Sequence, residues 1–154
     1  MLDHILVPLD HSQLAEQALN YASAIVNDEG QITLLSVVEE TIDVVYNNDI
    51  FATAGGIVRR DAPPKTDIRQ PAEDYLHQVA YRIARPHVKI VTLVLMGKPA
   101  DVIIDTAKNM NVNAIVMSTH GRTGITRWMY GSVTQKVLAA APCPVFVIPS
   151  QMFS

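Results

Sequence analysis

The chain has 154 residues, 49% of them hydrophobic and 18% charged, with a formal net charge of −3 and a pI near 5.9. That length suits one compact domain with its own buried core, and the charge balance argues against nucleic acid or an anionic membrane as a partner. The one cysteine, Cys143, excludes an intrachain disulfide and a zinc site built from several cysteines.

The beginning of the chain, MLDHILVPLDHS, lacks the basic segment and long apolar core of a signal peptide. No apolar run reaches the roughly 18 to 20 residues that a membrane span needs. We therefore expect a cytoplasmic protein.

The first two apolar runs flank a helical pattern. The run from His4 to Asp10 predicts a strand, and QITLLSVVEE predicts a second strand over Ile32 to Val38. Ser12 is a suitable N-cap for the helix between them. One face of that helix is predicted to carry apolar residues at steps of four: Leu14, Ala18, Ala22 and Val26.

A long segment, 39–70, follows without apolar periodicity. It contains NND, GG and PP, which are turn and breaker signals. A loop of this length in a small domain is usually functional or disordered.

The alternation then resumes to the end of the chain. Pro71 predicts the first position of a second helix, whose apolar stripe is Tyr75, Leu76, Val79 and Ile83. The remaining elements are a strand from Lys89 (KIVTLVLM), a helix from Pro99 with Ile103, Ala107 and Met110 on one face, a strand over Ala114 to Ser118, a helix in GSVTQKVLAAA and a strand in PVFVIP.

This order of elements predicts an α/β fold in a single domain. The strand runs are apolar throughout, which indicates burial on both faces. Right-handed crossovers then give a Rossmann-like open five-stranded parallel sheet with helices on both faces. We expect the strand order 3-2-1-4-5.

Ligands of such sheets bind at the carboxyl ends of the strands, near the point where the strand order reverses. Four positions meet that rule: Pro8 to Asp10, Val37 with Val38, Gly97, and the stretch from Met117 onward.

The stretch MSTHGRTGITRWMYGSVTQ has the most suitable chemistry for a phosphate. Gly121 and Gly124 leave the backbone open, while Arg122 and Arg127 add positive charge. The N–H groups of the last helix's first turn would supply donors, and they belong to the residues after Gly131: Ser132, Val133 and Thr134. The alternative is that glycine and serine only end a strand and cap a helix.

Other phosphate and nucleophile motifs fail on spacing. PLDHSQ contains no glycine for a dinucleotide fingerprint, and Gly97-Lys98 is followed by Pro99 rather than by the serine or threonine of a P-loop. The pattern GxSxG does not occur.

With these motifs the chain resembles the universal stress protein family, whose nucleotide-binding members carry Gly-x2-Gly-x9-Gly followed by Ser or Thr. Gly121 and the pair Gly131-Ser132 match the pattern, and Ser118 stands in place of its first glycine. The segments ILVPLDHS, LLSVVEE, GKPADVIID and APCPVFVIP also resemble the family, in the same order.

The resemblance implies the ATP-binding type, with a fold like that of the adenine nucleotide alpha hydrolases and with ATP, ADP or AMP as ligand. Asp10 would lie beside the adenosine, Val37 would contribute a backbone contact to the base, and Met117 and Ser118 would approach the ribose and α-phosphate. Gly121, Arg122, Gly131, Ser132, Val133 and Thr134 would surround the phosphates, and the predicted site also includes Pro8, Leu9, His120 and Gly124.

Two of these residues leave alternatives open. If Ser118 needs positive φ, serine costs about 1 kcal/mol or more in strain; in extended backbone it costs little and its hydroxyl could donate to a phosphate, which is the alternative we favour. Asp10 could hold Mg²⁺ or Mn²⁺ with the nucleotide, or it meets the nucleotide's hydroxyls or caps the first helix.

The resemblance implies a regulatory protein of the stress response rather than a catalyst. No residues form an organised centre for hydrolysis, so we expect no catalytic residue and at most weak ATP hydrolysis. Family members commonly dimerise through the last strand, here Val145, Phe146, Val147 and Ile148, an apolar edge open to pairing. The alternatives are a nucleotide-free homodimeric scaffold that acts through protein partners, and a slow ATPase.

Overall fold

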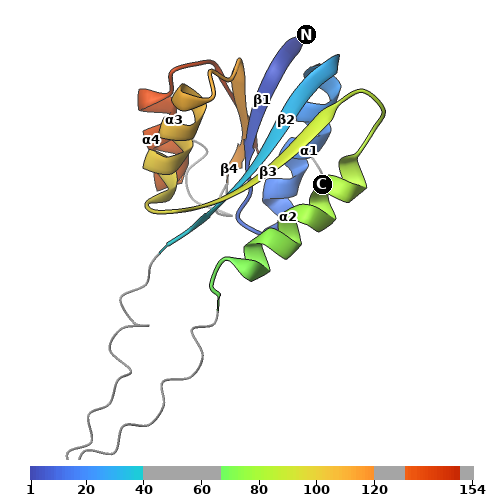
Figure 1. Ribbon diagram of the computed structural model, residues 1–154. Helices are drawn as coiled ribbons and strands as arrows, with labels where there is room; N and C mark the ends of the chain where they lie inside the picture. Colours follow the sequence, from blue (N-terminus) through green and yellow to red (C-terminus); the bar gives the residue numbers. More distant parts are fainter. Residues whose placement is uncertain (40–66, 120–130, 150–154) are drawn as a thin grey trace, which may run out of the picture.

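The computed structural model describes residues 1–39, 67–119 and 131–149. Within these ranges, strands and helices alternate along the chain (Figure 1). In order they are β1 (Leu2–Pro8), α1 (Gln13–Ile25), β2 (Val26–Val38), α2 (Gln70–Ile83), β3 (Lys89–Met96), α3 (Pro99–Asn109), β4 (Ala114–Thr119), α4 (Ser132–Ala140) and β5 (Val145–Pro149). The predicted site residues His120, Gly121, Arg122 and Gly124, and most of the segment 39–70, lie outside the described residues.

The five strands form one parallel sheet in the order β3-β2-β1-β4-β5, which confirms the predicted topology. The chain builds outward from β1 through β2 to β3, and then crosses back to place β4 on the other side of β1. The strand order therefore reverses between β1 and β4.

Both faces of the sheet are covered, as the apolar strand runs predicted. Successive side chains of a strand point to opposite faces, so Ile5 and Val7 pack with α1 and α2 while Leu6 packs in a second core with α3 and α4. Figure 1 shows the two helix pairs on opposite sides of the sheet. In β4 the same alternation places Val116 in the first core and Met117 in the second.

Helix α1 starts as predicted but buries a different stripe. The Ser12 side chain accepts a hydrogen bond from the Ala15 N–H at 3.0 Å, which confirms it as the N-cap. Ala18 and Ala22 are buried as predicted, whereas Leu14 is only half-buried and Val26 already belongs to β2. The predicted face was therefore right in its middle and wrong at its ends. A step of four residues advances about 40° beyond a full turn, whereas the observed stripe combines steps of three and four: Ala15, Ala18, Leu19 and Ala22.

Two strand boundaries differ from the prediction. β1 ends at Pro8, so Asp10 lies in the turn before α1 rather than in the strand. β2 begins at Val26, before the stretch NDEG, which reads locally as a turn. Its pairing with β1 shifts register there, and a Cβ on Gly30 would lie 2.7 Å from Val26 Cγ2 and 3.0 Å from the Asp3 carbonyl oxygen. Glycine permits this close approach of two backbones.

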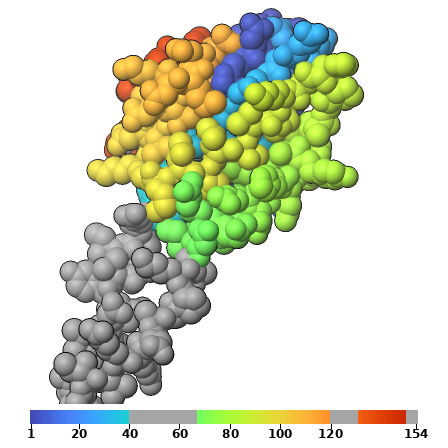
Figure 2. Space-filling view, in the orientation of Figure 1, coloured from blue at the N-terminus to red at the C-terminus, as the bar shows by residue number. Residues whose placement is uncertain are grey.

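Helix α2 runs beside the edge strand β3, and Figure 2 shows the two on the viewed face of the molecule. The helix begins at Gln70, one residue before the predicted start at Pro71. Leu76 and Val79 are buried as expected. The preceding Arg69 donates a hydrogen bond from Nη2 to the Val94 carbonyl of β3 at 2.6 Å.

Candidate functional site

The carboxyl end of β1 places Asp10 at the point where the strand order reverses. After Pro8, the N–H of Leu9 still donates to the Leu35 carbonyl of β2 at 2.8 Å, and Leu9 is buried. The chain then turns outward, and Asp10 is exposed.

The Asp10 carboxylate holds the start of α1. Its Oδ1 accepts hydrogen bonds from the Ser12 N–H at 3.0 Å and from the Ser12 hydroxyl at 2.5 Å. Ser12 Oγ in turn accepts from the Ala15 N–H. Asp10 therefore does not cap α1 itself but holds the N-cap residue Ser12, and these hydrogen bonds orient its carboxylate in the turn before the helix.

Ser118 lies in ordinary extended backbone. It belongs to β4, pairs with Ile148 of β5 and is half-buried. Among the described non-glycine residues, positive φ angles occur at His11, His87 and Asn111, and so not at Ser118. Serine in place of the first patterned glycine therefore imposes no backbone strain here.

Thr119, which the sequence analysis left out of the site, ends β4 with an unsatisfied hydroxyl. The residue is 5% exposed, and its Oγ1 has no hydrogen-bond partner within the described residues. By alternation with Met117, its side chain faces the side of the sheet that carries α3 and α4. Because a buried hydroxyl without a partner costs about 1 to 3 kcal/mol, such a group calls for a physical explanation.

The N-terminus of α4 carries no side-chain cap from the part of the chain that the structure describes. Gly131 occupies the N-cap position with φ −58° and ψ 159°, angles that any residue can adopt. A Cβ there would meet none of the described atoms within 4 Å. Neither the backbone nor the packing of the described chain requires glycine at this position, so the space suits a ligand that approaches closely.

The first turn of α4 supplies the predicted N–H donors. Ser132 is exposed, Val133 half-buried and Thr134 buried. The first N–H groups of a helix have no partner within the helix, and together with the helix dipole they favour an anion. At this end of α4 the helix itself therefore favours a negative over a positive charge.

The remaining predicted positions lie on β2 and after β3. Val37 is near the end of β2 and is half-buried. Gly97 has a structural reason of its own, since its φ is +141° and a Cβ would lie 2.9 Å from Val102 Cγ2. Its N–H donates to the Val38 carbonyl at 3.1 Å. Gly97 thus shapes the turn into α3.

Groups suited to metal binding or nucleophilic chemistry are sparse in the same ranges. The part of the chain that the structure describes contains no cluster of three or more His, Cys, Asp or Glu side chains that could hold a metal ion. Burial raises the pKa of the half-buried Cys143 thiol, so this group stays protonated and weakly nucleophilic. No helix of the described ranges is long and apolar enough to cross a membrane.

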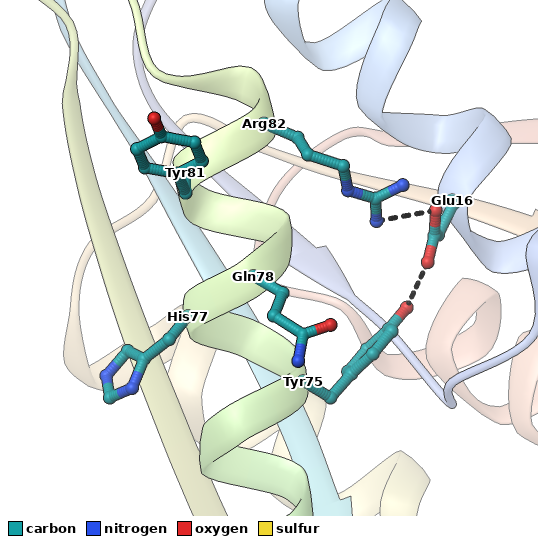
Figure 3. Close-up of a pocket in the computed structure, with 6 residues that line it drawn as sticks. All are labelled: Glu16, Tyr75, His77, Gln78, Tyr81 and Arg82. Carbon is teal, nitrogen blue, oxygen red and sulfur yellow. Dashed lines mark hydrogen bonds and ion pairs between the residues drawn. The ribbon is translucent and has the colours of Figure 1, made fainter.

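A surface hollow of about 640 Å³ is lined by Glu16 of α1 and otherwise by residues of α2. Figure 3 shows Tyr75 and Arg82 of α2 reaching toward Glu16 of α1, while His77 and Tyr81 project from the other side of α2. The Tyr75 hydroxyl donates to Glu16 Oε1 and Arg82 Nη2 donates to Oε2, each at 2.9 Å. Burial, followed by the Glu16 carboxylate, raises the pKa of Tyr75. These partners satisfy one another, so we interpret the contact as a link between two helices.

Comparison with known proteins decides the family. Residues 1–149 match the model of the Universal stress protein family. The chain belongs to this family. This universal stress protein is similar to Universal stress protein MJ0577 of Methanocaldococcus jannaschii, with 26% identity over 156 residues that cover 96% of this chain and 95% of the relative.

Solved structures of the family share the fold. The structure of MJ0577 aligns with a TM-score of 0.73 at 24% identity, covering 96% of this chain and 95% of the other. A universal stress protein family protein from Arabidopsis thaliana with AMP bound has a TM-score of 0.57 at 16% identity, covering 95% and 90% of the two chains. A universal stress protein in complex with cAMP gives 0.61 at 15% identity, covering 97% and 98%. Homologues of this universal stress protein thus bind adenine nucleotides.

Proposed function

We propose that this universal stress protein binds an adenine nucleotide, ATP, ADP or AMP, where β1 and β4 end, and acts as a regulatory protein of the stress response. The observation that carries the proposal is the uncapped first turn of α4 behind Gly131, where a Cβ would meet no described atom. The AMP and cAMP complexes of two homologues support the same ligand class.

In this proposal, different described residues bind the phosphate and the adenosine. The first turn of α4 and the Thr119 hydroxyl serve the phosphate, because both offer donors without a described partner. Asp10 serves the adenosine, with its carboxylate already oriented by Ser12. Pro8, Leu9, Val37, Met117 and Ser118 line the ends of the strands. We propose binding rather than turnover.

The test is to look for nucleotide carried by the purified protein. Denaturing it should release an adenine nucleotide that chromatography identifies, and millimolar AMP or ATP should raise its melting temperature. A ligand at 100 times its dissociation constant stabilises the fold by about 2.7 kcal/mol. No released nucleotide together with no thermal shift would refute the proposal.

Gly131→Val tests whether the phosphate binds at the N-terminus of α4. Valine tolerates the observed φ and ψ, and its Cβ would meet none of the described atoms within 4 Å. Because valine is a poorer N-cap residue than glycine, the unliganded variant should lose about 0.5 to 1 kcal/mol of stability, and the ligand-induced shift is measured from its own melting temperature. The valine side chain would fill the space in front of the α4 N–H groups, and the ligand-induced shift should disappear. A variant that keeps the full shift would place the phosphate elsewhere.

A second candidate is a homodimer that acts through protein partners without nucleotide. β5 is an edge strand, and Phe146 on it is 44% exposed, as is Leu138 of α4 at 43%. Of the predicted interface residues, Val145 and Val147 are half-buried, and Ile148 is buried in the core of its own chain. Only the backbone of Ile148 is therefore available to a partner strand. Ser118→Gly separates the candidates, because binding that appears only with glycine favours the scaffold.

A further inference from the structure

His11 holds an unusual backbone conformation between the two residues that form the turn before α1. Its φ is +67°, in the left-handed region that an L-residue with a Cβ adopts at a cost in free energy. The preceding Asp10 and the following Ser12 are joined by two hydrogen bonds. A reversal of the chain at His11 lets the Ser12 N–H and hydroxyl both reach the Asp10 carboxylate.

The His11 side chain fastens this turn to two other elements. Its ring stacks on Tyr75 of α2, with centroids 4.2 Å apart and planes inclined by 29°. Its Nε2 lies 3.3 Å from the Ser36 hydroxyl of β2. Ser36 is buried, so the imidazole lies between a strand of the sheet and a helix that is distant in sequence.

Tyr75 offers His11 a ring that is itself held in place. The Tyr75 hydroxyl donates to Glu16, which also accepts from Arg82 (Figure 3). Glu16 lies in the first turn of α1, directly after the turn that contains Asp10. The contacts therefore link His11 through Tyr75 to Glu16, in the first turn of the helix that follows the Asp10–Ser12 turn.

We propose that His11 is a positioning residue for nucleotide binding, which orients Asp10 through its stack on Tyr75. The inference rests on the proposed function, since it assigns Asp10 a ligand to meet. His11 itself touches no ligand in this proposal. Replacing a residue that only packs α2 against the sheet would lower the stability of the protein and its affinity for nucleotide together. Replacing a positioning residue lowers the affinity by more than the loss of stability accounts for.

His11→Gly isolates the role of the ring. Glycine adopts the left-handed conformation readily, so the turn remains allowed and the relief of strain offsets the lost stack. We expect a nearly unchanged melting temperature but AMP binding weaker by about three- to tenfold, the amount that an aromatic contact contributes. His11→Phe keeps a ring over Tyr75 and should restore most of the affinity.

The exchange rate of the Ser12 amide provides a measurement without ligand. This N–H donates to Asp10 Oδ1, so hydrogen exchange followed by NMR should be faster in His11→Gly and close to wild type in His11→Phe. If the wild-type protein binds no AMP, the proposed function fails, and the exchange rates still test whether His11 holds the turn.

Three results would overturn the positioning role. The first is wild-type protein that binds AMP no better than His11→Gly does. The second is a loss of affinity in His11→Gly that its loss of stability fully accounts for. The third is a Ser12 amide that exchanges at the same rate in both proteins.

Discussion

Replacing Thr119 by valine should stabilise the unliganded protein and weaken its affinity for AMP. Thr119 is 5% exposed, and its Oγ1 lacks a hydrogen-bond partner among the described residues. The folded protein therefore carries a desolvation cost of about 1 to 3 kcal/mol that the valine variant does not. Since a little exposure remains, we expect a gain near the lower limit, about 1 kcal/mol, or about 2 to 4 °C in melting temperature.

The same substitution should weaken AMP binding. If the hydroxyl meets the ligand, valine removes a hydrogen bond to a charged group and leaves the ligand oxygen without that donor. The expected loss is about tenfold in the dissociation constant, or about 1.4 kcal/mol. Calorimetric unfolding and titration with AMP, carried out on the same samples, measure the two effects, which have opposite signs.

Thr33→Val is the matched control. Thr33 is fully buried, and in contrast to Thr119 its hydroxyl has partners: it contacts His4 Nε2 at 2.9 Å and Gln31 Nε2 at 3.1 Å. Valine there removes both contacts of the hydroxyl, whereas His4 Nε2 and Gln31 Nε2 keep each other as partners, so the variant should lose about 1 kcal/mol of stability. If Thr119→Val destabilises the protein as Thr33→Val does, its hydroxyl is satisfied and the reasoning is wrong. An unchanged AMP affinity would remove Thr119 from the site.

Three further predictions concern other parts of the chain. Ser118→Gly should lower the free energy of unfolding in urea by about 0.5 to 1 kcal/mol, because glycine weakens a strand. It should leave the AMP affinity unchanged, and a large gain in affinity would contradict the extended backbone at this position. Desolvation lowers the pKa of His4 from 6.5, so below that pH the unfolded chain binds more protons than the folded protein does. The free energy of unfolding should therefore fall as the pH drops below 6.5 and level off once His4 is also protonated in the folded protein. His4→Gln should flatten this profile, and an equal slope in both proteins would exclude His4 as its source. Phe146→Glu should convert a dimer to a monomer in light scattering at micromolar concentration, because it places a charge on the exposed edge; a wild-type monomer would end the dimer hypothesis.

The order and type of the elements followed from the sequence because both are local properties. Runs of apolar residues with β-branched side chains indicated buried strands, and the steps of three and four between them indicated helices. The handedness of the crossovers then predicted a parallel sheet with helices on both faces, and the strand pairing confirmed the expected order. Where a boundary was wrong, as at NDEG inside β2, residues that read locally as a turn were held in a strand by pairing with β1.

The sequence predicted only part of the candidate site. Spacing and resemblance pointed to Asp10, Gly131 and the residues after it, because a phosphate cradle needs glycine and N–H donors close together in the chain. Neither could decide whether Ser118 takes positive φ, since that depends on its pairing with β5. The pairing places it in extended backbone.

Two features arose from tertiary structure alone. The hydroxyl of Thr119 lacks a described partner only because the sheet and its helices bury it, and no local pattern marks one threonine as unsatisfied. His11 meets Tyr75 across 64 positions of sequence, and their contact requires α2 to dock beside the end of β1. The sequence by itself determined which elements form and which residue types lie at the strand ends. The packing of distant elements decided which residue has a strained backbone, which hydroxyl lacks a described hydrogen-bond partner, and which side chains are held in place.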